Sequence, residues 1–385
     1  MRIAYVTETW PPELNGVALT AARTVQRLRS RGHVVQVVRP RQAGDVGVPS
    51  GGDELLLPGV RLPMYRDLQV GLPFARPLKQ AWQSFEPQLV HIATEGPLAW
   101  AALRAGRSRR ATVTSDYRTR FDLYGRYYGF SVLTPVIRRY LRAFHNRCDL
   151  TCVPAPDLIA ELLAQGFENL EVHGRGIDVE RFAPAWRDET LRRSWGERGP
   201  FVLSVGRLAR EKNLELLAQS FEAIRARQPG ARLIVVGDGP MRGELERRLP
   251  DALFCGHRSG ADLAQIYASA DLFLFPSLTD TFGNVVLEAL ASGLPTVAFD
   301  RAAANMHMSD GVDGRVIATD DPAGFIIAAV SLAADATLRA HLSVNARGTA
   351  LALGWDSVLD RFEASLMNTC AVPETGIIDE YARLA

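Results

Sequence analysis

Several features that mark large protein classes are missing from this sequence of 385 residues. Cys148 and Cys152 form a Cys-x3-Cys spacing with no second pair, and Cys255 and Cys370 stand alone, so the sequence predicts reduced thiols and no zinc site. No run of about 18 apolar residues occurs, so no membrane span is predicted. The start, MRIAYVTETW, lacks the charged and apolar segments of a signal peptide, so we expect a cytoplasmic protein.

The glycine fingerprint of a dinucleotide-binding domain is also missing. Gly-x-Gly-x-x-Gly would follow the first predicted strand, residues 2–7, but residues 8–16 read ETWPPELNG, which disfavours an oxidoreductase. No Asp-x-Asp pair follows a predicted strand, so no metal is expected. The net charge of +1 gives no global indication of a nucleic-acid partner.

An α/β pattern is present along the whole chain. Short apolar runs alternate with helical segments, which predicts two domains with doubly wound parallel sheets. The predicted parts are a first domain over 1–182, a linker over 183–199, a second domain over 200–354, and a last helix with a tail over 355–385 that crosses back to the first domain. Residues 41–63 and 302–313 are predicted to be irregular.

The most informative stretch is residues 270–297, ADLFLFPSLTDTFGNVVLEALASGLPTV. Residues 271–275 predict a buried strand, 276–281 a polar loop, and 282–292 a helix that ends at Gly293. Open α/β sheets bind ligands at the carboxyl ends of their strands. The first turn of a helix offers unpaired amides that suit phosphate.

Two carboxylates flank this turn, Asp280 before the helix and Glu288 inside it, with seven residues between them. The helix from Gly283 to Glu288 rises roughly 7–8 Å, so the two acids would face different parts of one ligand. A nucleotide sugar fits, because it has hydroxyl-rich rings at both ends and a diphosphate between them. The alternative is that Asp280 caps the helix and Glu288 is a solvated helix position.

This stretch resembles the acidic motif of retaining glycosyltransferases with the GT-B fold, the large family that includes mannosyl-, glucosyl- and sulfoquinovosyltransferases (glycosyltransferase family 4-like). Residues 288–293, Glu-Ala-Leu-Ala-Ser-Gly, match the second half of the motif, and Asp280 stands where the family has its first Glu. The resemblance covers nearly the whole chain. It implies two doubly wound domains that face a cleft, with the acceptor bound by the first and the donor nucleotide sugar by the second.

The resemblance also implies roles for residues of the second domain. Arg207 and Lys212, in the loop after the predicted strand 201–205, would neutralise a diphosphate, unless they are ordinary surface charges. Asp280 would contact the transferred sugar and Glu288 the ribose. Further donor contacts are expected from Thr281, Phe282, Gly283 and Asn284, with Arg258 near the nucleobase.

In the first domain, the resemblance implies that Gly16 gives its backbone N–H to the diphosphate; alternatively Gly16 only permits a turn. His91, at the end of the predicted strand 88–92, would approach the acceptor, or it is a satisfied structural residue. Asp116 and Arg118 follow the predicted strand 111–115. Arg118 stands where similar members often have a His; it could hold a phosphate or an anionic acceptor, but it cannot act as a general base.

Basic and aromatic residues are mixed in residues 124–130 and in the predicted helix 136–146, which carries Arg138, Arg139 and Arg142. Such a face can rest on an anionic membrane surface. The alternative is a solvated helix face with its aromatic residues turned inward. Membrane contact would imply a lipid-linked acceptor.

Together these features predict a retaining hexosyltransferase that acts on a lipid or glycan hydroxyl. GDP-mannose is the first choice of donor and a UDP-hexose the second. No cofactor, metal or nucleic-acid partner is expected, and the protein would be cytoplasmic or peripheral on the inner face of the membrane. Two alternatives remain open: a nucleotide-sugar epimerase of the same architecture, and a non-catalytic protein that binds sugar nucleotides.

Overall fold

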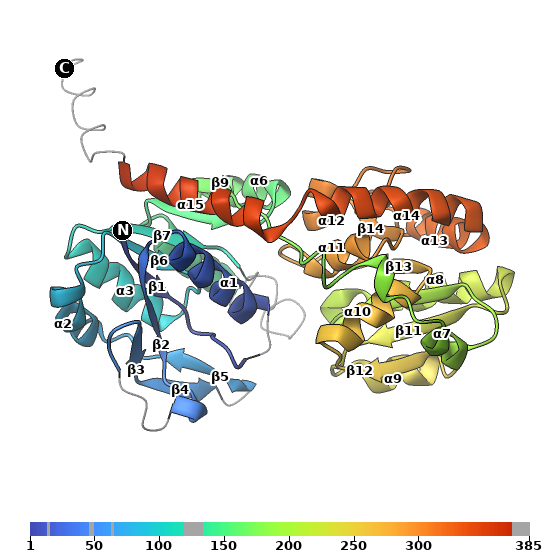
Figure 1. The fold of residues 1–385 in the computed structure, drawn as a ribbon, viewed down its shortest axis with the longest axis horizontal. Coiled ribbons are helices and arrows are strands. Elements are labelled where there is room, and N and C mark those ends of the chain that lie inside the picture. Colours follow the sequence, from blue (N-terminus) through green and yellow to red (C-terminus); the bar gives the residue numbers. More distant parts are fainter. Residues whose placement is uncertain (14–15, 46–49, 63–64, 119–133, 372–385) are drawn as a thin grey trace, which may run out of the picture.

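The computed structural model describes residues 1–13, 16–45, 50–62, 65–118 and 134–371. Two parallel β-sheets, one from each half of the chain, lie side by side with helices packed around them (Figure 1). Parallel strands are covered on both faces, which agrees with their nearly continuous apolar sequences, such as RLIVV at residues 232–236.

The first sheet has seven parallel strands in the order β3-β2-β1-β6-β7-β8-β9. They are β1 (Arg2–Val6), β2 (Val34–Pro40), β3 (Glu54–Leu57), β6 (Leu89–Ile92), β7 (Thr112–Asp116), β8 (Leu150–Val153) and β9 (Leu170–Val172). Its helices are α1 (Gly16–Ser30), α2 (Ala75–Phe85), α3 (Pro97–Arg107), α5 (Thr134–His145) and α6 (Pro156–Ala164), and β4 (Gly59–Leu62) with β5 (Tyr65–Gly71) forms a separate antiparallel pair. Successive strands are added on one side of β1 up to β3 and on its other side from β6 onward, so the strand order reverses between β1 and β6. Open α/β sheets bind ligands at such a switch point.

The second sheet repeats the arrangement with six parallel strands in the order β12-β11-β10-β13-β14-β15. They are β10 (Phe201–Val205), β11 (Arg232–Val236), β12 (Leu253–Gly256), β13 (Leu272–Phe275), β14 (Thr296–Phe299) and β15 (Gly314–Ile317). Its helices are α7 (Glu189–Trp195), α8 (Leu214–Arg227), α9 (Arg242–Arg248), α10 (Gly260–Ser269), α11 (Asn284–Ala291), α12 (Ala302–His307), α13 (Pro322–Ala334) and α14 (Ala336–Leu351). Here the switch point lies between β10 and β13.

Two segments that the sequence predicted to be irregular contain regular structure. Residues 41–63 hold β3 and β4, and residues 302–313 begin with α12, so both predictions are wrong. Strand β3 was not predicted because it is short and has glycine and proline on either side; it pairs with β2. Helix α12 is six residues long and starts at Ala302 with φ 52°, a left-handed conformation that side-chain propensity does not predict.

The segment 183–199, predicted as a linker, carries α7. Asp188 caps this helix by accepting hydrogen bonds from the amides of Thr190 and Leu191. Trp195 is buried, and its ring lies 5.4 Å from that of Phe201. The segment therefore packs on the second sheet.

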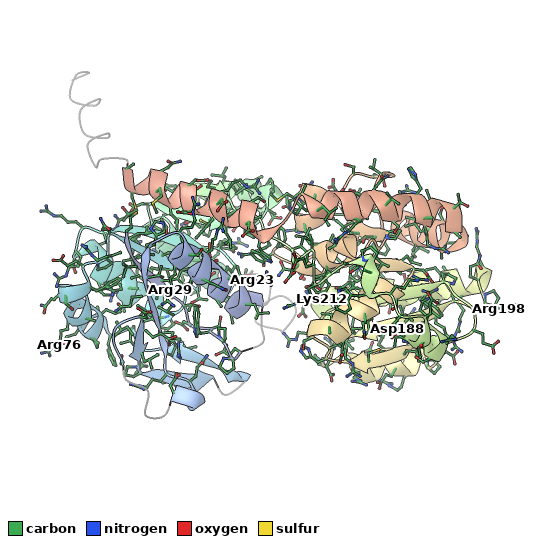
Figure 2. The ribbon with its side chains drawn as sticks, viewed as in Figure 1. Arg23, Arg29, Arg76, Asp188, Arg198 and Lys212 are labelled. Atoms are coloured by element: carbon green, nitrogen blue, oxygen red, sulfur yellow. The ribbon has the colours of Figure 1, made fainter. Side chains whose placement is uncertain are left out.

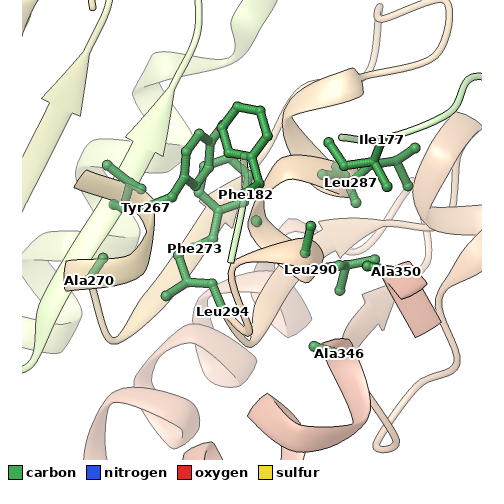
Figure 3. Packing of buried hydrophobic residues seen from close by; sticks show 14 of the residues in the cluster. Ile177, Phe182, Tyr267, Ala270, Phe273, Leu287, Leu290, Leu294, Ala346 and Ala350 are labelled. Carbon is green, nitrogen blue, oxygen red and sulfur yellow. The ribbon is translucent and has the colours of Figure 1, made fainter. Parts of the chain in front are cut away.

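A hydrophobic cluster fixes α11 on the second sheet (Figure 3). Leu287 and Leu290 of α11 pack with Tyr267 of α10, Phe273 of β13 and Ala346 of α14. Because the apolar face of this short helix is buried, the position of its N-terminus is set by the core.

The last helix, α15 (Trp355–Ala371), packs against the first half of the chain (Figure 1). Phe362 and Leu366 enter the core that contains Tyr5, and Glu363 pairs with His33 at 2.9 Å. Where the chain crosses back, the amide of Ile177 donates to the carbonyl of Leu353 at 3.0 Å. The two connections between the sheets therefore lie against each other.

All four cysteines are free thiols, as expected from their spacing. Among the helices of the described residues, none is by itself both long and apolar enough to span a membrane. Helices α13 and α14 meet the criteria of length and composition only as a pair, and the pair is bent by 103°.

Candidate active site

The loops after β10 and β13 meet at the switch point of the second sheet. These strands are parallel neighbours, so their carboxyl ends open onto the same place. The Nζ of Lys212 donates to Oδ1 of Asp280 at 2.6 Å. Thr279 also donates to the carbonyl of Glu211 at 2.9 Å, and Asn213 to that of Pro276 at 3.2 Å. Both loops therefore build one site, and Figure 2 shows Lys212 on the side of its domain that faces the first domain.

Asp280 keeps one oxygen for a ligand. Its Oδ2 is buried and has no hydrogen-bond partner among the described residues. The N-cap of α11 is Gly283, and no side chain caps the helix. The alternative that Asp280 is a helix cap is therefore wrong, and Oδ2 can accept a hydrogen bond from a ligand hydroxyl.

Helix α11 starts next to this carboxylate. It begins at Asn284, two residues later than predicted, after Gly283 with φ 83°, a left-handed conformation that favours glycine. Phe282 is buried and Thr281 half-buried. The first amides of a helix lack intrahelical acceptors and suit an anion. The sequence-predicted donor contacts at 281–284 thus adjoin Asp280.

Arg207 adds a second cation to the Lys212 loop. Its Nη1 lies 3.9 Å from Oε1 of the buried Glu211, and its side chain is 39% exposed. The guanidinium is therefore accessible to an anionic ligand. The structure places Arg207 and Lys212 on one loop, and their role in holding a diphosphate stays a prediction.

Glu288 lies on α11, where the hydroxyl of Tyr267 donates to its Oε2 at 2.9 Å. Burial raises the pKa of Glu288 to about 7, against the lowering effects of that hydrogen bond and of Arg181. Glu288 is only partly exposed. The alternative of a solvated helix position is therefore wrong, and the carboxyl is held in place for a polar ligand.

Gly16 of the first domain reaches the same region. A Cβ built on Gly16 would lie 3.6 Å from Nδ2 of Asn284, at the start of α11. Gly16 is the first residue of α1 and does not have the positive φ that a turn would require of glycine. The turn alternative is thus not supported, and the start of α1 faces the start of α11.

A buried network lies at the carboxyl ends of β6 and β7 in the first sheet; its members are His91, Asp116 and Arg118. Arg118 pairs with Asp116 and donates to the Tyr5 hydroxyl at 3.2 Å. His91 is fully buried, with Nδ1 2.9 Å from the hydroxyl of Thr114 and Nε2 3.3 Å from Asp116. Burial alone would raise the pKa of Asp116, but Arg118 and His91 lower it well below its usual range.

This network corrects two expectations from the sequence. His91 is a satisfied structural residue and does not approach an acceptor, because both of its ring nitrogens have partners and its side chain is not exposed. The guanidinium of Arg118 is committed to Asp116, Tyr5 and the carbonyl of Val17, so it is not free to hold a phosphate or an anionic acceptor. Both residues hold Asp116 in place.

Arg175 is a residue for which sequence reasoning gave no role. Burial, followed by the repulsion of Arg118, lowers its pKa to about 10, while Asp116 and Tyr5 act in the opposite direction. No hydrogen bond or ion pair joins its guanidinium to another residue of the described ranges. Its neighbour Gly174 lies against Met306 and Phe282 of the second domain. Arg175 is therefore a cation at the boundary of the two domains.

Two other predicted features remain. Arg258 is exposed after β12, the strand at one side of the second sheet, and its place near a nucleobase stays a prediction. Residues 124–130 lie outside the described part of the chain. In that part, no group of three or more His, Cys, Asp or Glu side chains is arranged to hold a metal ion. Metal-independent chemistry stays a prediction.

Known proteins share both halves of this arrangement. Residues 14–181 match the family model described as Glycosyltransferase Family 4, and residues 199–335 match that described as Glycosyl transferases group 1. A GDP-mannose-dependent alpha-mannosyltransferase of Mycobacterium tuberculosis is 36% identical over 311 residues, which cover 78% of this chain and 79% of that relative. The chain belongs to glycosyltransferase family 4. A Mycolicibacterium smegmatis relative of the same name is 33% identical over 376 residues, 95% of this glycosyltransferase and 98% of the relative.

Solved structures show the fold of this glycosyltransferase. HepE of Anabaena, in complex with UDP, has a TM-score of 0.75 at 19% identity and covers 96% of this chain and 100% of its own. Sucrose-phosphate synthase of Thermosynechococcus elongatus has a TM-score of 0.74 at 18% identity, and the match covers 95% of this chain and 98% of the synthase chain. The GT-B fold and the family resemblance expected from the sequence are confirmed.

Proposed function

We propose that this glycosyltransferase moves a hexosyl group, with mannosyl as the first choice, from a nucleoside diphosphate sugar to a hydroxyl of a lipid or glycan acceptor. The observation that carries the proposal is the pairing of Lys212 with Asp280 beside the start of α11, with Oδ2 of Asp280 left without a partner. Relatives that are 36% and 33% identical are GDP-mannose-dependent, which supports GDP-mannose ahead of a UDP-hexose.

Each part of the donor has a matching group in the site. Lys212, Arg207 and the first amides of α11 would bind the diphosphate, because cations and unpaired amides are the groups that phosphate oxygens accept from. Oδ2 of Asp280 would accept a hydroxyl of the transferred sugar. Glu288, five residues beyond Gly283 on the same helix, would bind the ribose hydroxyls.

We propose a same-face transfer with retention of the anomeric configuration. The bond between the anomeric carbon and the diphosphate oxygen breaks, and the acceptor oxygen bonds to the same face of that carbon. The acceptor proton passes to the departing phosphate oxygen. Arg207 and Lys212 would stabilise the negative charge of the leaving group, and this preorganised charge would supply much of the rate gain. No step in this scheme needs a metal or a side-chain base.

Titration calorimetry with GDP, UDP and ADP tests the donor site. We expect one nucleotide to bind tightly, and Arg207→Ala to weaken it strongly, while Arg227→Ala, which removes an exposed arginine at the end of α8, leaves binding unchanged. Failure of all three nucleotides to bind would overturn the proposal. Product analysis then separates the alternatives: an epimerase would invert a sugar carbon of the donor, and a non-catalytic binder would leave the donor intact.

We further propose that α5 contacts an anionic membrane surface. Val136 is 65% exposed, Tyr140 is 38% exposed, and the neighbouring Arg139 and Arg142 are exposed on the same helix. Cations beside exposed apolar side chains favour such a surface. Sedimentation with phosphatidylglycerol vesicles should capture the protein, and Arg139→Glu with Arg142→Glu should release it, whereas Arg227→Glu should not. Equal capture by phosphatidylcholine vesicles would contradict the proposal.

A further inference from the structure

Two glutamates occupy the switch point of the first sheet, the place that Lys212 and Asp280 occupy in the second. Glu8 follows β1 by two residues, and Glu95 follows β6 by three. Strands β1 and β6 are parallel neighbours, so the loops that follow them lie side by side at the carboxyl ends of the strands. The amide of Glu8 donates to the hydroxyl of Thr94 at 2.9 Å, which ties the two loops together.

Glu8 is fixed by the start of α3. It is 7% exposed, and its Oε1 accepts from the amide of Leu98 at 3.2 Å. A Cβ on Gly96 would overlap the Glu8 carboxyl, so the lack of a side chain at Gly96, which follows Glu95, leaves room for that carboxyl. Burial raises the pKa of Glu8 to about 7, although backbone amides of Leu98 and Gly71 lower it.

Glu95 is the less satisfied of the two. It is 5% exposed, and its Oε1 has no hydrogen-bond partner among the residues that the structure describes. Its carbonyl accepts from the hydroxyl of Tyr140 at 3.0 Å, so the backbone is held. Burial raises the pKa of Glu95 to about 8, although a hydrogen bond from its own backbone amide lowers it; Asp116 and Glu8 raise the pKa further, and Arg118 lowers it.

A buried carboxyl oxygen without a partner is destabilising, and such groups are normally hydrogen-bonded. The nearby cation cannot relieve it, because Arg118 is committed to Asp116. Each of the two carboxyls is either neutral or negatively charged. An ionised carboxylate repels an anionic ligand, whereas a hydroxyl can accept a hydrogen bond from a neutral carboxyl and donate one to a carboxylate.

We propose that Glu8 and Glu95 form the acceptor subsite, and that this subsite receives a hydroxyl-bearing group without negative charge, such as a sugar ring or a glycerol head group. This inference rests on the proposed function and narrows it, since it excludes a phosphate or carboxylate at this position of the acceptor. Oε1 of Glu95 bonds an acceptor hydroxyl, and Glu8 bonds a second hydroxyl of the same group.

Two matched pairs of acceptors test whether the subsite prefers an uncharged acceptor group to an anionic one. They are dioctanoylglycerol against dioctanoylphosphatidylglycerol, and octyl glucoside against octyl glucuronide. We expect turnover or calorimetric binding of an uncharged member, and Glu95→Leu should raise its KM by about tenfold or more. The affinity for GDP, which the second domain determines, should stay the same, and this also reports that the variant is folded.

Glu95→Gln separates ligand contact from a structural role. Glutamine resembles the neutral acid and does not ionise, so this variant should keep the KM of the parent at about pH 7 and lack the change in KM that the parent shows between about pH 7 and pH 9. Glu8, Asp116, Arg118 and Tyr140 face Glu95 and are unchanged in this comparison. Glu168→Gln, at an exposed position of the same domain, should behave as the parent at both pH values.

Preference for the anionic member in both pairs would overturn the inference. So would binding of none of the four acceptors, or an unchanged KM in Glu95→Leu. If GDP binds and donor is consumed in these experiments, only the acceptor assignment fails. If no nucleotide binds, the proposed function fails first.

Discussion

The ammonium of Lys212 lies 2.6 Å from Oδ1 of Asp280, although 68 positions separate the two residues in the sequence. An ammonium has three donors, so Lys212 keeps two for phosphate oxygens while Asp280 holds the third. Asp280 in turn keeps Oδ2 for a sugar hydroxyl. The pair thus links the group that would bind the diphosphate to the group that would bind the transferred sugar.

Asp280→Asn tests the sugar side of this pair. The amide keeps the size of the side chain but removes the charge that orients Lys212. We expect kcat to fall by about a hundredfold, with the affinity for GDP changed by about threefold or less, because the nucleotide contacts remain. Steady-state kinetics and calorimetry measure the two quantities. Asp320→Asn changes an exposed aspartate of the same domain and serves as the control; an unchanged kcat in Asp280→Asn would remove Asp280 from the site.

Lys212→Met tests the diphosphate side. Methionine keeps an unbranched apolar chain but removes the cation, and a hydrogen bond to a charged group contributes about 1.5–3 kcal/mol, so GDP affinity should fall by about tenfold to a hundredfold. The chain has one other lysine, Lys79 on α2, which is exposed and supplies a matched control. Equal nucleotide affinity in Lys212→Met and Lys79→Met would contradict the assignment.

Glu288 should make the stability depend on pH. Its pKa is raised from 4.5 to about 7 in the folded protein, so the folded state binds a proton more tightly than the unfolded state. Its contribution is fully present below about pH 4.5 and is lost as the pH rises through about 7, by on the order of 3 kcal/mol. Glu288→Gln should remove this part of the loss. Urea unfolding of both proteins at about pH 5 and pH 8 measures it, and identical pH dependence would show that Glu288 is not perturbed.

Gly176 should be intolerant of a side chain, because a Cβ there would lie 2.6 Å from Cα of Trp355. Gly176→Ala must push apart the two connections between the domains, and we expect it to lower the free energy of unfolding by about 1–3 kcal/mol. Gly354 lies on the other connection, where a Cβ would meet nothing within 4 Å. Gly354→Ala is the control, and equal stability of the two variants would mean that the connections separate freely.

Much of the second domain could be predicted from sequence, because its strands are continuous apolar runs bounded by glycine and proline. Strand β10 has the predicted bounds. Strand β3 was missed, because its four residues lie in a segment rich in glycine and proline and gain their stability from pairing with β2. Helix α12 was missed because it is short and held by tertiary contacts.

The residues proposed to bind the donor were identified through motifs that lie close together in the sequence. The acceptor-side residues were not, because no local pattern joins Glu8 to Glu95. Their proximity follows from the placement of β6 beside β1, which is a property of the whole sheet. His91 and Arg118 were assigned to ligands for the same reason: their partners Thr114, Asp116 and Tyr5 come from other strands or loops.

Helix α15 has a consequence for how the protein is made. The ring of Phe362 lies 5.1 Å from that of His91 and 5.6 Å from that of His173, and Leu366 is fully buried in the core behind β1. The ribosome therefore completes the whole second domain before it releases the helix that closes the first. Until then the nascent first domain exposes apolar surface, and the second domain is the one that can finish folding earlier, although it is translated later.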